Sequence, residues 1–475
     1  MMEPGHGGFS VNRRAFLGRS AGALGPLALA HLLTQGTPRV LADSAPPAGP
    51  REPRAQAVIC LFQHGGPSQV DLFDPKSELT KRHGQPYPGR LEVHFDKQQG
   101  NLLASPFAFR PRGESGIAMS ELLPHTATIA DEITLVRSMT TESVDHESAL
   151  RLIHSGKFQA GRPTWGSWVI YGLGSENREM PAYVVLTDPG GLPVDGVRNW
   201  SSAWLPAVYQ GTPFQPGAAP VPNLTCPEGV TPETQAGQLA FLAELNRSHL
   251  ARHHDVAELE ARIANFETAA RMQTAVPEIL DLSGESAATR RLYGLDRDET
   301  REYGTRCLLA RRLVERGVRF VQLFLGGQPW DTHSSIRSTL PEICRRTDRP
   351  AAALVTDLKQ RGLLDTTIVH WGGEIGRLPV SEGNLDDGAG RDHNGQGFSI
   401  WLAGGGIKGG MTFGSTDDVG HRAVENVVTP NDFQATIMHL FGLDHNRLVY
   451  HANGREQRLT DGRSARVVKG ILQRA

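Results

Sequence analysis

The chain of 475 residues is long enough for one large α/β domain with insertions, or for about three domains of ordinary size. Its 49 Lys and Arg residues almost balance its 51 Asp and Glu residues, which excludes the broad basic surface of a nucleic-acid-binding protein. Only 4 cysteines occur and none forms a CxxC motif, so a disulfide scaffold and a zinc ribbon are excluded. Any metal must therefore be bound by carboxylates and by some of the 18 histidines.

The N-terminal residues have the organisation of an export signal. Arg13 and Arg14 precede a mildly apolar stretch over 21–33, and this order is typical of a twin-arginine signal. The apolar stretch is too short to span a membrane. We therefore predict a twin-arginine signal peptide over 1–42 and a flexible linker over 43–56. The export machinery would be a partner, and the protein would reach the periplasm or the extracellular space without a stable membrane anchor.

Six short runs after the linker are typical of buried strands. They are rich in β-branched residues and apolar on both faces, as expected of central strands in a covered parallel sheet. These runs are Ala57–Phe62, Ile133–Val136, Ala182–Thr187, Val318–Leu325, Thr367–Trp371 and Phe398–Ala403.

Helical patterns lie between these runs, at 304–317, 351–362 and 431–443. The longest periodic segment, 237–273, predicts one or two long amphipathic helices. It carries His249, His253 and His254, which we expect to lie on a solvent-facing helix surface.

Alternating strands and helices predict an α/β fold, a three-layer α/β/α sandwich. We expect a single domain over 57–475, with a loop-rich and helical insertion over 188–300.

Polar residues cluster where the predicted strands end. Ligands of α/β sheets bind beyond the carboxyl ends of the strands, so these positions predict a site. Carboxylates and imidazoles together suit Zn, Mn or Fe, whereas all-oxygen sets suit Mg or Ca. Glu374 and Arg377 could instead form a structural ion pair. The candidate residues are His64, Asp71, Thr140, Thr141, Ser143, His146, Asp331, His333, Glu374 and His393.

Nucleotide binding is not supported. No GxGxxG opens a helix after the first strand, and no GxxxxGK[ST] occurs.

Several blocks, in this order, resemble the exported bacterial proteins of the domain of unknown function 1501 family. They are the twin-arginine leader, HGGPSQVDLFDPK, RSMTTESVDHESALRLIHSG, PWDTHSS, WGGEIGR and GRDHNGQGFSIWLAGGGIKGG. That family is placed in the alkaline-phosphatase-like superfamily, together with the sulfatases. The resemblance implies that superfamily's fold, a site for divalent metal (Zn, Mn, Ca or Mg) and a hydroxyl nucleophile that attacks a phosphate or sulfate ester.

Carried over by motif, the resemblance implies metal ligands at Asp331, His333, Glu374 and His393. The relatives' aspartate at the first strand would fall at Gln63 or His64, so either Asp71 replaces it or the second metal of the relatives is lost. The nucleophile would be Ser143, Thr141 or Thr140, and His146 would act as ligand or base. The C-x-P-x-R motif of formylglycine sulfatases is absent, which contradicts that chemistry.

The resulting hypothesis is an exported metal-dependent hydrolase that acts on a small-molecule or glycan ester of phosphate or sulfate. The alternative is a non-catalytic envelope or periplasmic binding protein on the same fold.

Overall fold

The structure, a computed structural model, describes residues 53–94, 99–177, 179–217, 220–226, 228–253, 257–452 and 454–473. The predicted signal peptide over 1–42 and most of the predicted linker lie outside these residues. The backbone amides of Arg54 and Ala55 both donate to the carbonyl of Leu440, at 2.9 and 3.0 Å. The last residues of the predicted linker are thus packed against the folded body.

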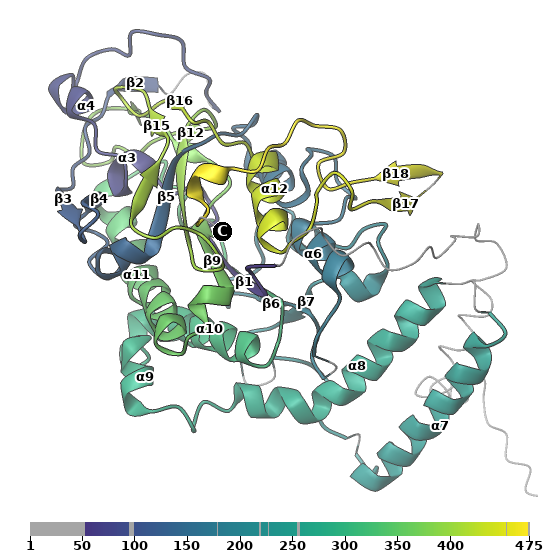
Figure 1. Ribbon diagram of the computed structural model, residues 1–475. Coiled ribbons are helices and arrows are strands. Elements are labelled where there is room, and N and C mark those ends of the chain that lie inside the picture. The colour runs from purple at the N-terminus through teal and green to yellow at the C-terminus, as the bar shows by residue number, and fades with distance from the viewer. Residues whose placement is uncertain are drawn as a thin grey trace, which may run out of the picture.

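An eight-stranded sheet lies at the centre of the described part of the chain, in the order β14-β5-β13-β9-β1-β8-β6-β7 (Figure 1). All six predicted apolar runs are strands of this sheet, because side chains that are apolar on both faces are stable only where both faces are covered. Its strands are β1 (Ala57–Phe62), β5 (Ile133–Met139), β6 (Tyr183–Leu186), β7 (Thr212–Phe214), β8 (Phe320–Phe324), β9 (Thr367–Gly372), β13 (Phe398–Ala403) and β14 (Met411–Phe413).

One central strand runs against its neighbours. β13 pairs antiparallel with both β5 and β9, with Phe398 opposite Met139 and Trp401 opposite Trp371. The other pairs of this sheet are parallel. The expectation of a parallel strand at 398–403 is wrong, because burial on both faces indicates where a strand lies and not its direction. As a result, β13 begins at the edge of the sheet where β5 and β9 end.

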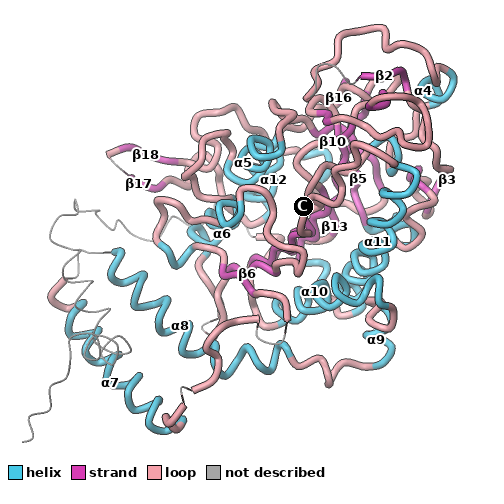
Figure 2. Tube along the Cα trace, turned by 180° about the vertical axis from the view of Figure 1, so that it is seen from behind, coloured by secondary structure: helices cyan, strands magenta, loops and turns pink. Residues whose placement is uncertain are grey.

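Helices cover both faces of the sheet. Ile59 and Leu61 of β1 face one core, which includes α10 (Asp298–Glu315) and α11 (Ile336–Gln360). The alternate residues of β1 face a second core, which includes α5 (His146–Ser155), α6 (Trp165–Leu173) and α12 (Pro430–Leu440). Figures 1 and 2 show these two groups of helices on opposite sides of the sheet. The predicted three-layer α/β/α sandwich is confirmed.

The segment over 188–300 supplies one edge strand, β7, and three helices. These helices are α7 (Pro232–Leu250), α8 (Ala257–Leu280) and α9 (Ala287–Leu292), so the periodic segment over 237–273 forms parts of two helices. No residue of α7 is buried, and Figure 1 shows α7 and α8 reaching away from the body. His249 is half-buried and His253 is exposed, while His254 lies outside the described residues.

Smaller elements surround the sheet. Two short helices are α3 (Gln69–Leu72) and α4 (Ser77–Lys81). Five two-stranded pairs are β2 (Gln99–Leu102) with β11 (Val380–Glu382), β3 (Phe109–Arg112) with β4 (Ile117–Ser120), β10 (Gly376–Arg377) with β12 (His393–Asn394), β15 (Ser415–Thr416) with β16 (Ala423–Glu425), and β17 (Tyr450–Ala452) with β18 (Arg455–Gln457). Short 3₁₀ helices occupy Thr126–Glu132, Gly196–Trp200, Ala207–Tyr209, Leu364–Thr366 and Lys469–Ile471.

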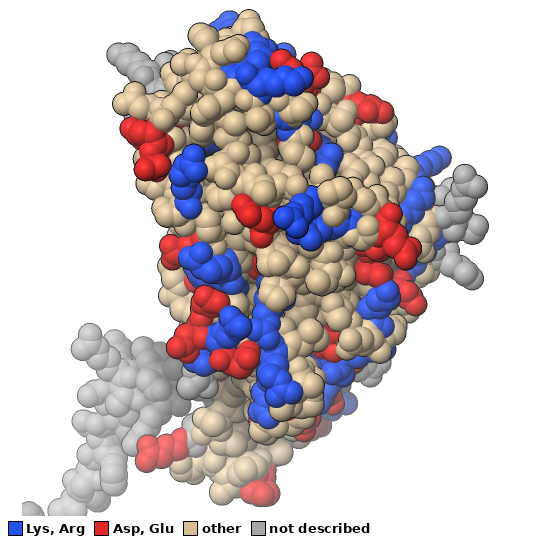
Figure 3. Space-filling model, turned by 90° about the vertical axis from the view of Figure 1, so that its left-hand side faces the viewer, with Lys and Arg blue, Asp and Glu red and all other residues tan. Residues whose placement is uncertain are grey.

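The surface carries charges of both signs. On the face shown in Figure 3, basic and acidic side chains are interspersed, in keeping with the balanced composition. Among the described residues, none of the helices has the length and apolar character that a membrane crossing requires.

Candidate metal centre

Loops from five strands that lie side by side in the main sheet meet at one edge. His64, Glu374 and Asp331 follow β1, β9 and β8, and His146 opens α5 after β5. His393 precedes β13, whose antiparallel direction brings its start to the same edge. This edge is the usual place for a ligand site in an α/β sheet.

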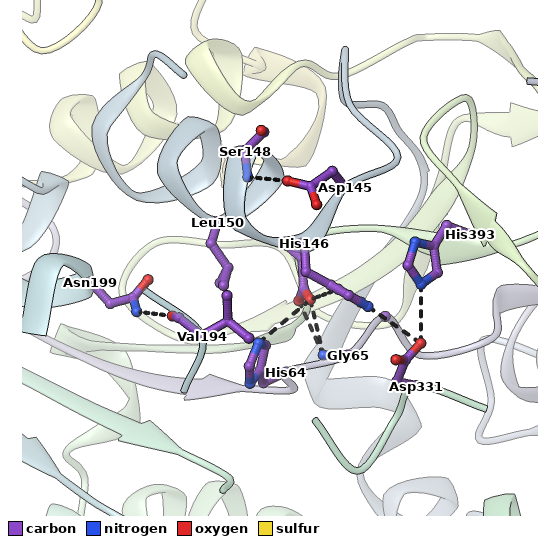
Figure 4. A network of polar contacts seen from close by, with 12 residues as sticks. His64, Gly65, Asp145, His146, Ser148, Leu150, Val194, Asn199, Asp331 and His393 are labelled. Carbon is purple, nitrogen blue, oxygen red and sulfur yellow. Dashed lines mark hydrogen bonds and ion pairs between the residues drawn. The ribbon is translucent and has the colours of Figure 1, made fainter. Parts of the chain in front are cut away.

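One carboxylate oxygen lies at the centre of the site. Oδ1 of Asp331 is 2.9 Å from Nε2 of His333, 3.1 Å from Nε2 of His393 and 3.3 Å from Nε2 of His146. Figure 4 shows His146 and His393 both directed at Asp331. Nε2 of His333 and Nε2 of His393 are themselves 3.0 Å apart. Two imidazole nitrogens this close both expose lone pairs unless a proton or a cation lies between them. We call Asp331, His146, His333 and His393 the Asp331 cluster.

A second carboxylate lies deeper, beneath His146. Nδ1 of His146 is 2.6 Å from Oε1 of Glu374, and the amide of Gly65 donates to the same oxygen at 3.0 Å. Glu374 and His64 are fully buried, and Nε2 of His64 is 4.0 Å from Oε1 of Glu374. Neither ring nitrogen of His64 has a hydrogen-bond partner among the described residues. A buried imidazole without partners is costly, so it points to a further ligand.

Gly65 lets the loop after β1 pass close to the loop after β8. Its φ of +110° lies in the left-handed region, and a Cβ here would be 2.6 Å from the backbone nitrogen of Asp331. Any larger residue at this position would push Asp331 away from the cluster.

Arg377 ties three of the loops together from a fully buried position. Its guanidinium donates to the carbonyl of Gly66 at 3.0 Å and to the carbonyl of Arg391 at 3.1 Å. It also donates to the Gly65 carbonyl and to Oδ1 of Asp331. Within the described chain, its ion-pair partner is therefore Asp331 rather than Glu374.

The two central carboxylates are held ionised. Burial alone would raise the pKa of Asp331, but its close contacts with the three histidines of the cluster and the charge of Arg377 hold it well below its usual range. Burial would likewise raise the pKa of Glu374, but the hydrogen bond from His146 and the charges of His64 and His146 lower it to about 2.

The histidines divide into two groups. Burial would lower the pKa of His146, but its contacts with Asp331 and Glu374 raise it to about 9. The pKa of His333 is also raised, since its bonds to Asp331 and Glu382 outweigh burial. Burial lowers the pKa of His393 to about 4, and it lowers that of His64. His393 and His64 are thus neutral near pH 7, the state in which an imidazole binds a metal.

Two sets of three residues offer ligand atoms within 4.8 Å of one another, and His393 belongs to both. One set is His146, Asp331 and His393, and the other is His333, Asp392 and His393. A mixture of imidazole nitrogens and carboxylate oxygens suits Zn or Mn, whereas Ca and Mg prefer ligand sets made only of oxygens. Nε2 of His146 is buried and lacks an aligned hydrogen bond among the described residues. The residues present therefore fit a divalent metal.

Asp71 lies apart from this cluster, in a closed ion pair. Its Oδ2 is 2.7 Å from Nε of Arg391, and its Oδ1 is 3.1 Å from Nη2 of the same guanidinium. The hydroxyl of Ser68 donates to Oδ2 at 2.5 Å. Both charged side chains are wholly buried, so this carboxylate has no free face for a metal.

The three predicted hydroxyl groups follow β5, but they are differently engaged. Ser143 is half-buried, and its Oγ accepts from the amide of Asp145 at 3.0 Å, close to the first turn of α5. Thr140 and Thr141 line a neighbouring cleft instead. Of the three, Ser143 is the one nearest in sequence to His146.

Two acidic residues of the site escaped sequence reasoning. Oε2 of Glu382 contacts Nδ1 of His333 across 49 residues of chain, a pairing without a local signal. Asp392 belongs to a metal-compatible set with His333 and His393. Its position beside His393 in the GRDHN block was a usable signal.

Comparison with known proteins gives one strong match and several distant ones. A family model described as "Protein of unknown function (DUF1501)" matches residues 55–472. No curated protein matches the sequence. A phosphonate monoester hydrolase from Silicibacter pomeroyi is 10% identical with a TM-score of 0.33, over 74% of this chain and 71% of that one. A sulfatase from Pseudoalteromonas sp. is 11% identical with a TM-score of 0.33, over 86% and 76%. Lipoteichoic acid synthase from Listeria monocytogenes is 8% identical with a TM-score of 0.33, over 89% and 78%. Similarities this distant identify no activity.

Proposed function

Since this chain belongs to the DUF1501 family, whose function is unknown, we propose a function from its own site: a metal-dependent hydrolase of phosphate or sulfate esters. The observation that carries the proposal is the convergence of three imidazole Nε2 atoms on one oxygen of Asp331, within 3.3 Å. The buried and unpartnered ring of His64 supports it. The substrate class is a small-molecule or glycan ester.

Asp331, His146, His333 and His393 would hold the metal, with Asp392 beside them. A bound divalent ion supplies positive charge that stabilises the negative charge developing on the ester. Glu374 and His64, one step deeper, would hold the ring of His146 or complete the ligand set. Asp71 has no part in this assignment, because Arg391 already occupies it.

The chain's own residues would do the remaining work. Arg377 fixes Asp331 against the loops after β1 and before β13. The Ser143 hydroxyl is the candidate attacking group, since it lies just before the first turn of α5, where amide groups favour an anion. In the metal-free site, the His146 ring carries a proton near neutral pH. His146 would give up the proton on Nε2 when the metal binds, and would then act as a ligand.

The proposal is tested by metal content and turnover together. Protein purified without chelator should contain Zn or Mn at about one ion per chain, and it should hydrolyse an aryl phosphate or an aryl sulfate. His393→Ala should lose most of the metal and the turnover. His253→Ala, which replaces an exposed histidine in the segment after α7, is the matched control and should keep both. Absence of bound metal in the unaltered protein, with no effect of His393→Ala, would refute the proposal.

We also propose that the protein is exported through the twin-arginine route to the periplasm or beyond. Arg13 and Arg14, followed by the apolar stretch over 21–33, support this. Cells that produce the full chain should release it from the cytoplasm in a shortened form. The double variant Arg13→Lys/Arg14→Lys should retain it, whereas Arg19→Lys should not. A full-length chain confined to the cytoplasm would contradict export.

A second function, binding without catalysis, is favoured by one observation. The hydroxyl of Ser143 is engaged with the backbone of Asp145. If the protein only binds a ligand, Ser143→Ala and His393→Ala would leave ligand binding intact, and no ester would be turned over. If Ser143→Ala abolished ester turnover but kept the bound metal, the result would favour the hydrolase over the binding protein.

A further inference from the structure

A cleft of about 790 Å³ opens beside the Asp331 cluster. Two chain segments form the wall between them. Nδ1 of His393 is 2.5 Å from the carbonyl oxygen of Val144, on the side of the cluster. The amide of Thr141 donates to the carbonyl of Gly395 at 2.7 Å, on the side of the cleft. A ligand in the cleft would therefore lie next to the proposed reaction site.

The cleft carries more positive than negative charge. Arg422, Arg463 and Glu142 line it. Nη1 of Arg463 is 2.7 Å from Oε1 of Glu142, so these two charges offset each other. The guanidinium of Arg422 is exposed and makes no hydrogen bond or ion pair with another described residue. One uncompensated positive charge remains.

Two acids next to the lining residues are bonded to groups other than the Arg422 guanidinium. Asp417 accepts from the backbone amides of His421 at 2.8 Å and Arg422 at 3.0 Å. Asp432 lies in the first turn of α12, behind the lining residues Thr429 and Pro430. Its carboxylate accepts from the amide of Thr429 at 3.1 Å and from the amide of Arg466 at 2.8 Å. These bonds hold it in the capping box of α12, where its other charged neighbour is Arg466, at 3.8 Å.

A buried residue with an unpaired hydroxyl also lines the cleft. Thr141 is 5% exposed and lines the cleft, and its Oγ1 has no hydrogen-bond partner among the described residues. An unpaired buried hydroxyl costs free energy, which a ligand oxygen would recover. A free cationic guanidinium and a free buried donor in one cleft suit an oxyanion.

We propose that this cleft binds a second oxyanion of the substrate, a sulfate or phosphate group remote from the ester that reaches the Asp331 cluster. This inference rests on the proposed hydrolase function. The volume lies in the range of small-molecule sites, about 300 to 1,000 Å³, and exceeds what a single tetrahedral ion fills. The substrate class is thereby narrowed to esters that carry at least two such groups, as in a multiply sulfated or phosphorylated sugar.

A calorimetric titration with inorganic sulfate at low ionic strength tests whether the cleft binds an oxyanion. Arg422→Gln should weaken binding by about tenfold or more, because a charge-assisted bond is lost, and Thr141→Val should weaken it by about threefold. Arg290→Gln, which replaces an exposed arginine on α9, should bind as the unaltered protein does. Asp331→Asn and chelator-treated protein should also bind sulfate in the cleft. The sulfate titration is therefore independent of whether the protein holds a metal or has hydrolase activity.

Two disaccharides, with one and with two sulfate groups, test whether the anion belongs to a substrate. The second sulfate should improve affinity by about tenfold in the unaltered protein and by much less in Arg422→Gln. The proposal would be overturned if Asp331→Asn abolished sulfate binding while Arg422→Gln left it unchanged. Absence of sulfate binding would also overturn it, as would a second sulfate that gives no advantage.

Discussion

Two aspartates that follow strands of the same sheet have opposite environments. Asp71 is fully buried, with both carboxylate oxygens bonded to Arg391. Asp331 is 22% exposed, and one of its oxygens faces three histidines. Arg377 also contacts Asp331, but it does not enclose it.

The two aspartates differ in whether their partner side chains can release a proton. A guanidinium keeps its proton at every accessible pH, so the Asp71–Arg391 pair is permanently closed. Imidazoles can give up a proton and then bind a metal through the same nitrogen. The two sites thus separate a carboxylate that supports the fold from one that is available for chemistry.

The largest effect that would test this contrast is loss of metal from Asp331→Asn. We expect metal affinity to fall by about 100-fold or more, since the central anionic ligand becomes a neutral amide. Competition with a chelator of known affinity would measure it. A variant that binds metal as tightly as the unaltered protein would remove the distinction between the two aspartates.

Asp71→Asn makes the same chemical change in the other site, with the opposite pattern expected. The guanidinium of Arg391 would be left buried without its counter-ion, at a cost of about 3 to 5 kcal/mol in the free energy of unfolding. Metal affinity should stay unchanged. Urea unfolding and the chelator assay on the same preparation separate the two readouts, and metal loss in this variant would count against the assignment.

The sequence was sufficient to predict the strands and the sheet edge at which the candidate residues meet. Runs such as Ala57–Phe62 are apolar on both faces, and that property alone predicts a strand covered by helices on each side. Ligands gather beyond strand ends as a consequence of the topology. His64, His146, Asp331 and Glu374 could therefore be nominated from position alone.

The direction of β13 and the contacts between residues far apart in the sequence could not be predicted in the same way. His393 precedes its strand, and only the antiparallel course of β13 brings it to the other residues. Arg391 is 320 residues from Asp71 in the chain, and nothing near either residue predicts their bond. Such contacts depend on which loops meet, which is set by the whole fold.

The pH dependence of stability offers a smaller test of the cluster. The pKa of His146 is about 9 in the fold, above its unfolded value of about 6.5. Its contribution is fully present below about pH 6.5 and is lost as the pH rises through about 9, a change of about 3 kcal/mol. Urea unfolding of chelator-treated protein should show this decline. His146→Gln should show a flatter profile, and an equally steep one would contradict the role of His146.

The smallest effect should come from Ser68→Ala, which alters only the closed ion pair. The Ser68 hydroxyl donates to Oδ2 of Asp71 at 2.5 Å, and Arg391 still holds both oxygens when it is removed. A hydrogen bond to a charged group contributes about 2 kcal/mol, so the unfolding free energy should fall by about that amount. Ser143→Ala is the matched control on the side of the Asp331 cluster, and its half-buried hydroxyl should cost less stability. Because Ser68 serves a carboxylate that Arg391 already satisfies, metal affinity should not change. A change in metal affinity would mean that the two sites are coupled through the segment from Arg391 to His393.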